Sequence, residues 1–229
     1  MSRVLITGGG TGIGLGIATA LIEAGHTVLI SGRRPDVLAA AAERIGAIAV
    51  PGDITVEPEE IIAAAGPLDH LVNNAGHYIH APVGALTAEA FAGLYAVHVI
   101  APALLSQAFA AQATGPGAIV NIASTLAERP APGAAAYGAA KAGLVALTRQ
   151  LALELAPQGL RANALLPGIV PTAMTETDDP ARTAAMVALH PIGRLGMPGD
   201  IGEAVAWLLG ASWVTGAAIP IDGGLLVRE

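Results

Sequence analysis

Three side chains have the types and the spacing that proton transfer to a carbonyl oxygen requires. Tyr137 and Lys141 are four residues apart, and Ser124 precedes the tyrosine by thirteen. Residues four apart on a helix share one face. An ammonium beside a phenol favours the phenolate, so we expect Lys141 to lower the pKa of Tyr137 from about 10 towards neutrality. Such a phenol exchanges a proton with a carbonyl or carbinol oxygen, to which Ser124 also offers its hydroxyl.

A glycine-rich turn stands between an apolar run and a helical pattern. The turn covers residues 7–14, follows Val4-Leu5-Ile6 and opens the pattern of residues 15–22. Glycines let a pyrophosphate approach bare N–H groups at a helix N-terminus, and the preceding strand and following helix supply the context that this fingerprint needs. The sequence therefore predicts a dinucleotide site that includes Thr7, Gly8, Gly12, Ile13 and Gly14.

Five motifs in this order resemble those of the short-chain dehydrogenase/reductase family, nearly from end to end of the chain. They are the glycine turn, Asn73-Asn74-Ala75-Gly76, Ser124 with Tyr137 and Lys141, Pro167-Gly168 with Thr172, and Asp222-Gly223-Gly224. The resemblance implies a Rossmann fold, oxidoreductase activity and a nicotinamide cofactor. It also implies that Lys141 holds the nicotinamide ribose.

Apolar, β-branched runs alternate with alanine-rich helical patterns along one domain, residues 1–229. Near-continuous apolar strands alternating with helices are typical of an α/β fold, here a doubly wound parallel sheet of about seven strands with helices on both faces. We expect strands near residues 4–7, 27–31, 47–50, 70–73, 118–123, 161–166 and 218–221, and helices near 14–24, 35–45, 58–65, 88–113, 134–156 and 199–209. The segment 173–190 lacks a strong period and follows Pro167-Gly168, which favours a substrate lid.

The end of the second predicted strand lacks the carboxylate that would hold the ribose hydroxyls of NAD. Ser31-Gly32-Arg33-Arg34 stands there instead. Guanidinium groups suit a 2′-phosphate, so the sequence favours NADP(H), with NAD(H) as the alternative. Arg33 is the better candidate, Ser31 assists, and Arg34 has the alternative role of a solvated residue at the start of the next helix.

The resemblance assigns further residues to the cofactor. It implies that Asp53 meets the adenine amino group, although Asp53 or Thr55 is also suited to cap the following helix. Ile169 and Thr172 are implied to contact the nicotinamide amide. The other cofactor residues expected on this basis are Ile54, Asn74, Ala75, Gly76, Pro167, Gly168, and the catalytic Tyr137 and Lys141 themselves.

One position departs from the family pattern. Many relatives carry an asparagine whose carbonyl holds a water of a proton relay, and His98 takes that place here. A helical proline at residue 102 cannot donate to the carbonyl of His98, so the relay could run through that carbonyl. The imidazole would then modify the pH dependence of the reaction. In the alternative reading, His98 is a satisfied core residue.

Composition narrows the classes of partner. The formal net charge of −7 gives no basic footprint for nucleic acid, and the absence of cysteine excludes disulfides and thiolate metal sites. No histidine or carboxylate pair has convincing metal-ligand spacing. We expect a cytoplasmic protein without a signal peptide.

A stretch without charged residues runs from Glu89 to Glu128. A membrane span is one reading of this stretch. We favour a helix buried on more than one side, because proline, glutamine and glycine interrupt the apolar run. Its charge-poor surface and the family resemblance suggest a homodimer or homotetramer.

Three functions remain open at this point. The first is an NADPH-dependent reductase of a ketone or 3-oxoacyl compound, and the second is an NAD(P)-dependent alcohol dehydrogenase working oxidatively. The third is a non-catalytic nucleotide-binding protein, which the retention of Ser124, Tyr137 and Lys141 disfavours.

Overall fold

Seven apolar runs pair as parallel strands of one sheet in this computed structural model, which describes residues 1–172 and 179–228. The sheet order is β3-β2-β1-β4-β5-β6-β7. The strands are β1 (Arg3–Thr7), β2 (Thr27–Gly32), β3 (Ile48–Pro51), β4 (His70–Asn73), β5 (Gly117–Ile122), β6 (Leu160–Pro167) and β7 (Ala218–Ile221). The predicted strands are confirmed, with shifts of at most one residue at their ends.

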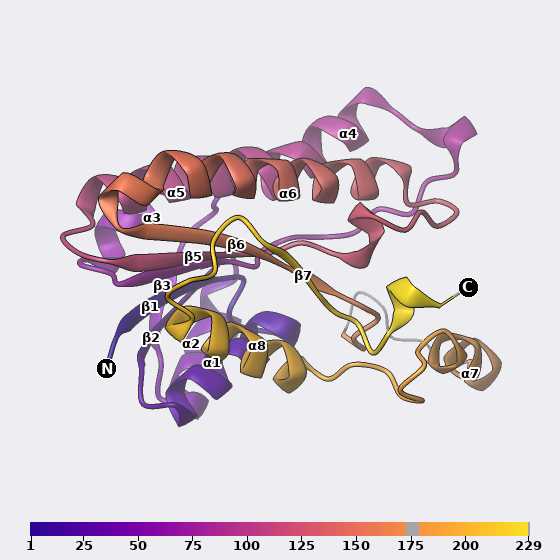
Figure 1. Ribbon diagram of the computed structural model, residues 1–229, viewed down its shortest axis with the longest axis horizontal. Coiled ribbons are helices and arrows are strands. Elements are labelled where there is room, and N and C mark those ends of the chain that lie inside the picture. Colours follow the sequence, from indigo (N-terminus) through magenta and orange to yellow (C-terminus); the bar gives the residue numbers. More distant parts are fainter. Residues whose placement is uncertain (173–178, 229) are drawn as a thin grey trace.

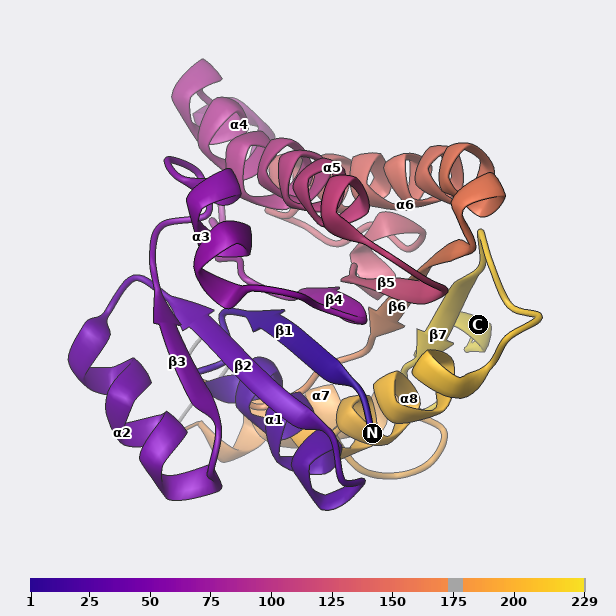
Figure 2. The same cartoon turned by 90° about the vertical axis from the view of Figure 1, so that its left-hand side faces the viewer.

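Helices cover both faces of the sheet (Figure 1). One face carries α3 (Pro58–Ala65), α4 (Ala88–Tyr95), α5 (Ala101–Gln112) and α6 (Ala135–Leu155). The other face carries α1 (Gly12–Glu23), α2 (Pro35–Ile45) and α8 (Pro198–Gly210). Figure 2 shows the two helical layers on opposite sides of the strands. The expected doubly wound α/β architecture is therefore confirmed.

A hydrophobic core lies on each side of the sheet. One core joins Ile6 and Ile30 to α1 and α8, and the other joins Leu5 and Leu29 to α3 and α5. Adjacent strand residues point to opposite faces, which explains why neighbours in sequence enter different cores. Full burial of such a side chain contributes about 1.5–3 kcal/mol to stability.

Two glycines allow α1 and α8 to pack closely. A Cβ added to Gly16 would lie 2.3 Å from Pro198, and one added to Gly202 would lie 2.9 Å from the Gly16 carbonyl oxygen. Larger side chains at either position would separate the helices. The glycine turn at the start of α1 is thereby held against the sheet.

The predicted helix over residues 88–113 contains a change of helical type. A π turn, η2 (Ala96–Ile100), joins α4 to α5. Ala88–Gln112 is by length and composition apolar enough to cross a membrane, with a hydropathy of 1.5. In this fold α5 packs against α3 and α6. Core helices of globular proteins share these properties.

The segment 173–190, whose sequence lacks a strong period, contains a helix in its described part. Residues Pro180–Ala188 form α7, whose N-cap Asp179 accepts a hydrogen bond from the Ala181 N–H. Residues 173–178 of the expected lid lie outside the described residues. Figure 1 shows α7 at the end of the molecule where the C-terminus lies.

Candidate active site

A cavity of about 1450 Å³ opens along the carboxyl ends of the strands. This is where ligands bind in doubly wound sheets, because the strand order reverses there between β1 and β4. Ser124, Tyr137, Lys141 and His98 line the cavity. So do the other residues expected to bind the cofactor, Thr7 and Ser31 excepted: Gly8, Gly12, Ile13, Gly14, Arg33, Arg34, Asp53, Ile54, Asn74, Ala75, Gly76, Pro167, Gly168, Ile169 and Thr172.

The catalytic candidates come from two adjacent elements. Ser124 follows β5 and caps the short helix η3 (Thr125–Ala127), where its Oγ accepts a 3.1 Å hydrogen bond from the Leu126 N–H. Tyr137 and Lys141 lie on successive turns of α6. A Cβ on Gly138 would lie 2.8 Å from the Leu126 carbonyl oxygen, so this glycine lets α6 approach η3. The Ser124 hydroxyl lies close enough to Tyr137 to influence the pKa of the tyrosine.

The expected lowering of the Tyr137 pKa by Lys141 is wrong for this structure. The protein surrounding Tyr137 withdraws its hydroxyl from water and raises its pKa above the ordinary value, against the opposing effect of the Ser124 hydrogen bond. Burial disfavours the phenolate, and here this effect outweighs the lowering effect of Ser124. Tyr137 is therefore a neutral phenol at physiological pH.

The burial of Lys141 explains why its amine has little effect on the pKa of Tyr137. The side chain is 4% exposed, and burial lowers its pKa to about 7. Its Nζ donates a 2.7 Å hydrogen bond to the Ile122 carbonyl oxygen and lies 5.6 Å from the centroid of the Tyr137 ring. An amine with this pKa is only partly charged at neutral pH.

His98 lies in the π turn, and a π turn in a helix is often associated with a functional site. Its Nε2 hydrogen-bonds to the His77 carbonyl oxygen at 2.8 Å, so the proton is assigned to Nε2. Burial lowers the His98 pKa to about 2. The expectation that this imidazole modifies the pH dependence is therefore wrong, because the ring stays neutral across the physiological range.

Two aromatic rings pack against the ring of Tyr137. The Tyr137 ring meets His98 edge to face, with centroids 5.3 Å apart, and meets Tyr78 in the same way at 5.1 Å. Edge-to-face contacts of this kind restrict ring rotation and contribute about 0.5–1.5 kcal/mol beyond area burial. These contacts therefore hold the Tyr137 ring in its orientation.

The glycine turn fits a dinucleotide pyrophosphate. Gly8 has a φ of +65°, and a Cβ on Gly14 would lie 2.2 Å from the Gly8 carbonyl oxygen. The N-cap of α1, Thr11, makes no side-chain cap, and the first turn holds no acidic residue. The N–H groups at this helix start can therefore bind an anion.

Thr7 acts on the loop after β4 rather than on the cavity itself. Its hydroxyl accepts hydrogen bonds of 3.0 and 3.1 Å from the N–H groups of Asn74 and Ala75. The Asn74 side chain donates back to the Thr7 carbonyl oxygen at 2.9 Å. Thr7 thus fixes the glycine turn against a second wall of the cavity.

Two arginines and one aspartate stand at the end of the cavity beside β2. Arg33 has an exposed guanidinium whose Nη1 lies 3.9 Å from the Asp53 carboxylate. Asp53 also accepts hydrogen bonds from the N–H and hydroxyl of Thr55, and these bonds hold its pKa below the usual value. The expectation that Ser31 assists in binding the 2′-phosphate is wrong, because Ser31 is fully buried and does not line the cavity.

A chain of buried hydrogen bonds links the sheet to α6. The Asn73 Nδ2 donates to the Asn121 Oδ1 at 2.8 Å, and the Asn121 Nδ2 donates to the Thr148 hydroxyl at 2.8 Å. The Thr148 hydroxyl in turn donates to the Leu144 carbonyl oxygen at 2.7 Å. Buried polar groups satisfied in this way specify one packing of the helix on the strands.

Some wall residues carry no sequence signal that would predict them. Met186 and Arg182 line the cavity from α7, and Leu225 lines it from the C-terminal helix η5 (Leu225–Val227). Arg129 lies opposite and donates to the Leu225 carbonyl oxygen at 2.5 Å. No group of three residues suited to hold a metal ion occurs in the described parts of the chain.

Comparisons with known proteins agree with this geometry. A family model described as enoyl-(acyl carrier protein) reductase matches residues 8–226. The chain is 35% identical to the L-xylulose reductase of Mesocricetus auratus, over 98% of this chain and 96% of that one. It is 34% identical to the D-erythrulose reductase of Gallus gallus, over the same shares. A blue fluorescent protein from a metagenomic library, solved in complex with NADPH, shares 32% identity and a TM-score of 0.92 over 98% of this chain and 97% of that one.

The fold and the site together define a dinucleotide-binding oxidoreductase that acts on carbonyl and CH–OH groups. The chain belongs to the short-chain dehydrogenase/reductase family.

Proposed function

We propose that this protein is an NADP(H)-dependent reductase of a small ketone. One observation carries the proposal: a single cavity holds Ser124, Tyr137 and Lys141 at one end and the unneutralised edge of the Arg33 guanidinium at the other. The glycine turn lies between them. An extended NADP(H) needs the same order along its length: the hydroxyl pair at the nicotinamide, the anion site at the pyrophosphate and the cation at the 2′-phosphate.

The protonation state of Tyr137 supports the reductive direction. A neutral phenol is ready to donate its proton, whereas alcohol oxidation needs a group ready to accept one. Bound NADPH supplies the hydride. Tyr137 gives its proton to the oxygen of the carbonyl, and Ser124 donates a hydrogen bond to the same oxygen as negative charge develops there.

Lys141 and His98 assist the proton transfer from Tyr137. The half-charged amine of Lys141 is suited to pass a proton towards Tyr137 and to bind ribose hydroxyls. The carbonyl of His98 lacks a donor four residues on, because residue 102 is proline, and is suited to hold a water of the proton path. The role of His98 is carried by its backbone carbonyl and not by a charged imidazole.

The substrate class follows from the walls of the catalytic end. His77, Tyr78 and His80 supply polar edges beside Tyr137, with Leu126 and Met186 as apolar surface. The named activities of the hamster and chicken relatives concern xylulose and erythrulose. A small polyhydroxy ketone suits these walls better than a long acyl chain.

The test is a panel of ketones, keto-sugars and 3-oxoacyl compounds with both cofactors, followed by nicotinamide absorbance. We expect turnover of small hydroxyketones with NADPH, and a loss of at least about a hundredfold in kcat for Tyr137→Phe with cofactor binding intact. Faster conversion of the matching alcohols than of the ketones near neutral pH would favour an oxidative dehydrogenase instead. Full activity of Tyr137→Phe would overturn the mechanism.

A further inference from the structure

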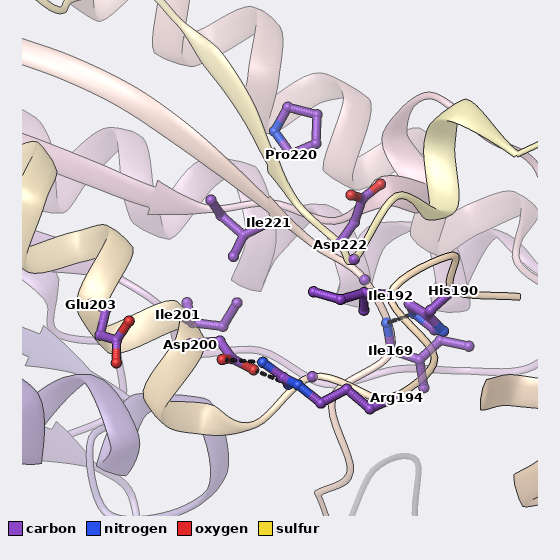
Figure 3. Close-up of a pocket in the computed structure, with 13 residues that line it drawn as sticks. Ile169, His190, Ile192, Arg194, Asp200, Ile201, Glu203, Pro220, Ile221 and Asp222 are labelled. Atoms are coloured by element: carbon purple, nitrogen blue, oxygen red, sulfur yellow. Dashed lines mark hydrogen bonds and ion pairs between the residues drawn. The ribbon is translucent and has the colours of Figure 1, made fainter.

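His190 is a buried histidine that the proposed chemistry does not use. It follows α7, is 3% exposed, and precedes a proline. Figure 3 shows His190 beside Ile169, with a hydrogen bond between them, in a second cavity behind the cofactor loop. Four charged residues line that cavity: Arg194 and Asp200, which are paired with each other at 2.7 Å, and Glu203 and Asp222.

Both nitrogens of this imidazole are used by backbone groups. The Nδ1 hydrogen-bonds to the Met186 carbonyl oxygen at 2.8 Å, and the Nε2 accepts from the Ile169 N–H at 3.3 Å. A carbonyl oxygen can only accept and an N–H can only donate. The two bonds therefore coexist only in the neutral ring with its proton on Nδ1, a tautomer assigned from these partners.

The two partners belong to two different elements that line the main cavity. Ile169 stands in the loop after β6 that lines the cofactor part, and Met186 stands in the last turn of α7. A Cβ on Gly168 would lie 3.1 Å from the His190 Nε2, so the loop and the ring are in close contact. The imidazole is a direct connection between the two walls.

Helix α7 is only partly covered by the rest of the described protein. None of its residues is buried, in contrast to α1, α6 and α8. Thr183, Met186 and Val187 are half-buried on one face of α7. A helix packed only through such a face gains less stability than a core helix, so a polar contact at its end contributes more to its position. His190, itself buried at the end of α7, is well placed to set where Met186 and Arg182 lie over the substrate.

We propose that His190 is a positioning residue that couples α7 to the cofactor loop through its two ring nitrogens. The Nε2 bond orients the Ile169 backbone for the cofactor, and the Nδ1 bond holds α7 over the substrate. This inference rests on the proposed function, because it assigns the cofactor to the Ile169 side and the substrate to the Met186 side.

Two substitutions separate the two bonds. In His190→Asn the side-chain amide occupies the place of Nδ1, so it keeps the Met186 bond and loses the Ile169 bond. In His190→Gln the amide oxygen reaches the place of Nε2, so it keeps the Ile169 bond and loses the Met186 bond. His70→Gln is the matched control, because the His70 Nδ1 likewise accepts from a backbone N–H, that of Ala118 at 3.0 Å, far from the cavity.

Three quantities are measured for each variant: the NADPH Kd by nicotinamide fluorescence, the KM for the ketone at saturating NADPH, and the urea midpoint. We expect His190→Asn to raise the Kd about fivefold, as for one lost hydrogen bond of about 1 kcal/mol, with the KM within about twofold of the wild type. We expect His190→Gln to show the reverse pattern. His70→Gln should lower only the urea midpoint.

Equal effects of both substitutions on Kd and KM, or no effect on either, would show that His190 is only a core residue. If one variant fails to fold, the other still tests its own bond. A wild type that binds NADPH but reduces no ketone would refute the proposed function, while the effect of His190→Asn on Kd would still decide the Ile169 bond.

Discussion

The Nζ of Lys141 donates its 2.7 Å hydrogen bond to the carbonyl oxygen of Ile122, at the end of β5. The amine is thereby held between the sheet and the tyrosine ring, in a place that water hardly reaches. Burial lowers its pKa to about 7. The active site keeps at its centre an ionisable group that the fold itself disfavours when charged.

We therefore expect Lys141→Met to be inactive but more stable. The lysine pKa is about 7 in the folded protein and 10.5 for an ordinary lysine in water, so the folded protein bears the full cost of a charged amine below about pH 7. That cost is at most about 5 kcal/mol and falls as the pH rises. After the lost hydrogen bond to Ile122 is subtracted, the free energy of unfolding of the variant should exceed that of the wild type by about 1–3 kcal/mol near pH 6.

Urea unfolding near pH 6 and near pH 9.5 tests this, and the advantage of the variant should nearly vanish at the higher pH. Lys141 is the only lysine of the chain, so lysine-selective isotope labelling gives one NMR signal whose titration reports its pKa directly. A pKa near the ordinary lysine value would contradict the expectation.

Arg33→Asp should change the preference between cofactors. Arg33 is an exposed guanidinium 3.9 Å from Asp53, free to turn towards a 2′-phosphate. Loss of a charge-assisted bond of about 1.5–3 kcal/mol should weaken NADPH by about tenfold to a hundredfold relative to NADH. The Kd values of both cofactors are the measurement, with Arg44→Ala at the exposed end of α2 as control. Equal weakening of NADPH and NADH would refute the 2′-phosphate assignment.

His98→Asn should leave the pH–rate profile unchanged. Burial lowers the pKa of His98 to about 2, so the ring is neutral between about pH 6 and pH 9 and removing it removes no titrating group. Because the proposed role belongs to the backbone, kcat should stay within about threefold of the wild type. A large loss of kcat, or a displaced pH profile, would assign the chemistry to the imidazole instead.

Acid should destabilise the fold through two buried histidines. Burial lowers the pKa of His70 to about 4 and that of His98 to about 2, while unfolded histidine titrates near 6.5. Below that value the unfolded chain binds more protons than the folded protein. The free energy of unfolding therefore decreases as the pH is lowered, by about 2 kcal/mol per histidine between pH 7 and pH 5. Urea midpoints at the two pH values should differ less for His70→Gln than for the wild type, and an equal difference would disprove the assignment.

The strands and the glycine turn could be predicted because each depends on local pattern. Ser31 could not be placed, because residues of a strand alternate between faces and the sequence does not say which face meets the cofactor. Leu29, two residues earlier, enters the core on the α3 side, and Ser31 is buried likewise.

The pKa of Tyr137 also depends on more than spacing. The four-residue interval with Lys141 is visible in the sequence, but the protein that surrounds both groups is not. Desolvation and charge act in opposite directions on a phenol, and only the folded structure shows which one is larger. Helix α7 was not among the predicted helices, because it is short and its one covered face, at Thr183, Met186 and Val187, is only half-buried.

The buried amides of Asn73 and Asn121, joined to Thr148, fix how far α6 can slide along the strands. The Tyr137 hydroxyl belongs to that helix, whereas most of the wall proposed to face the substrate comes from loops and from α7. Specificity can therefore diverge, in nature or in the laboratory, by exchange of those outer segments while the distance between tyrosine and nicotinamide is inherited unchanged.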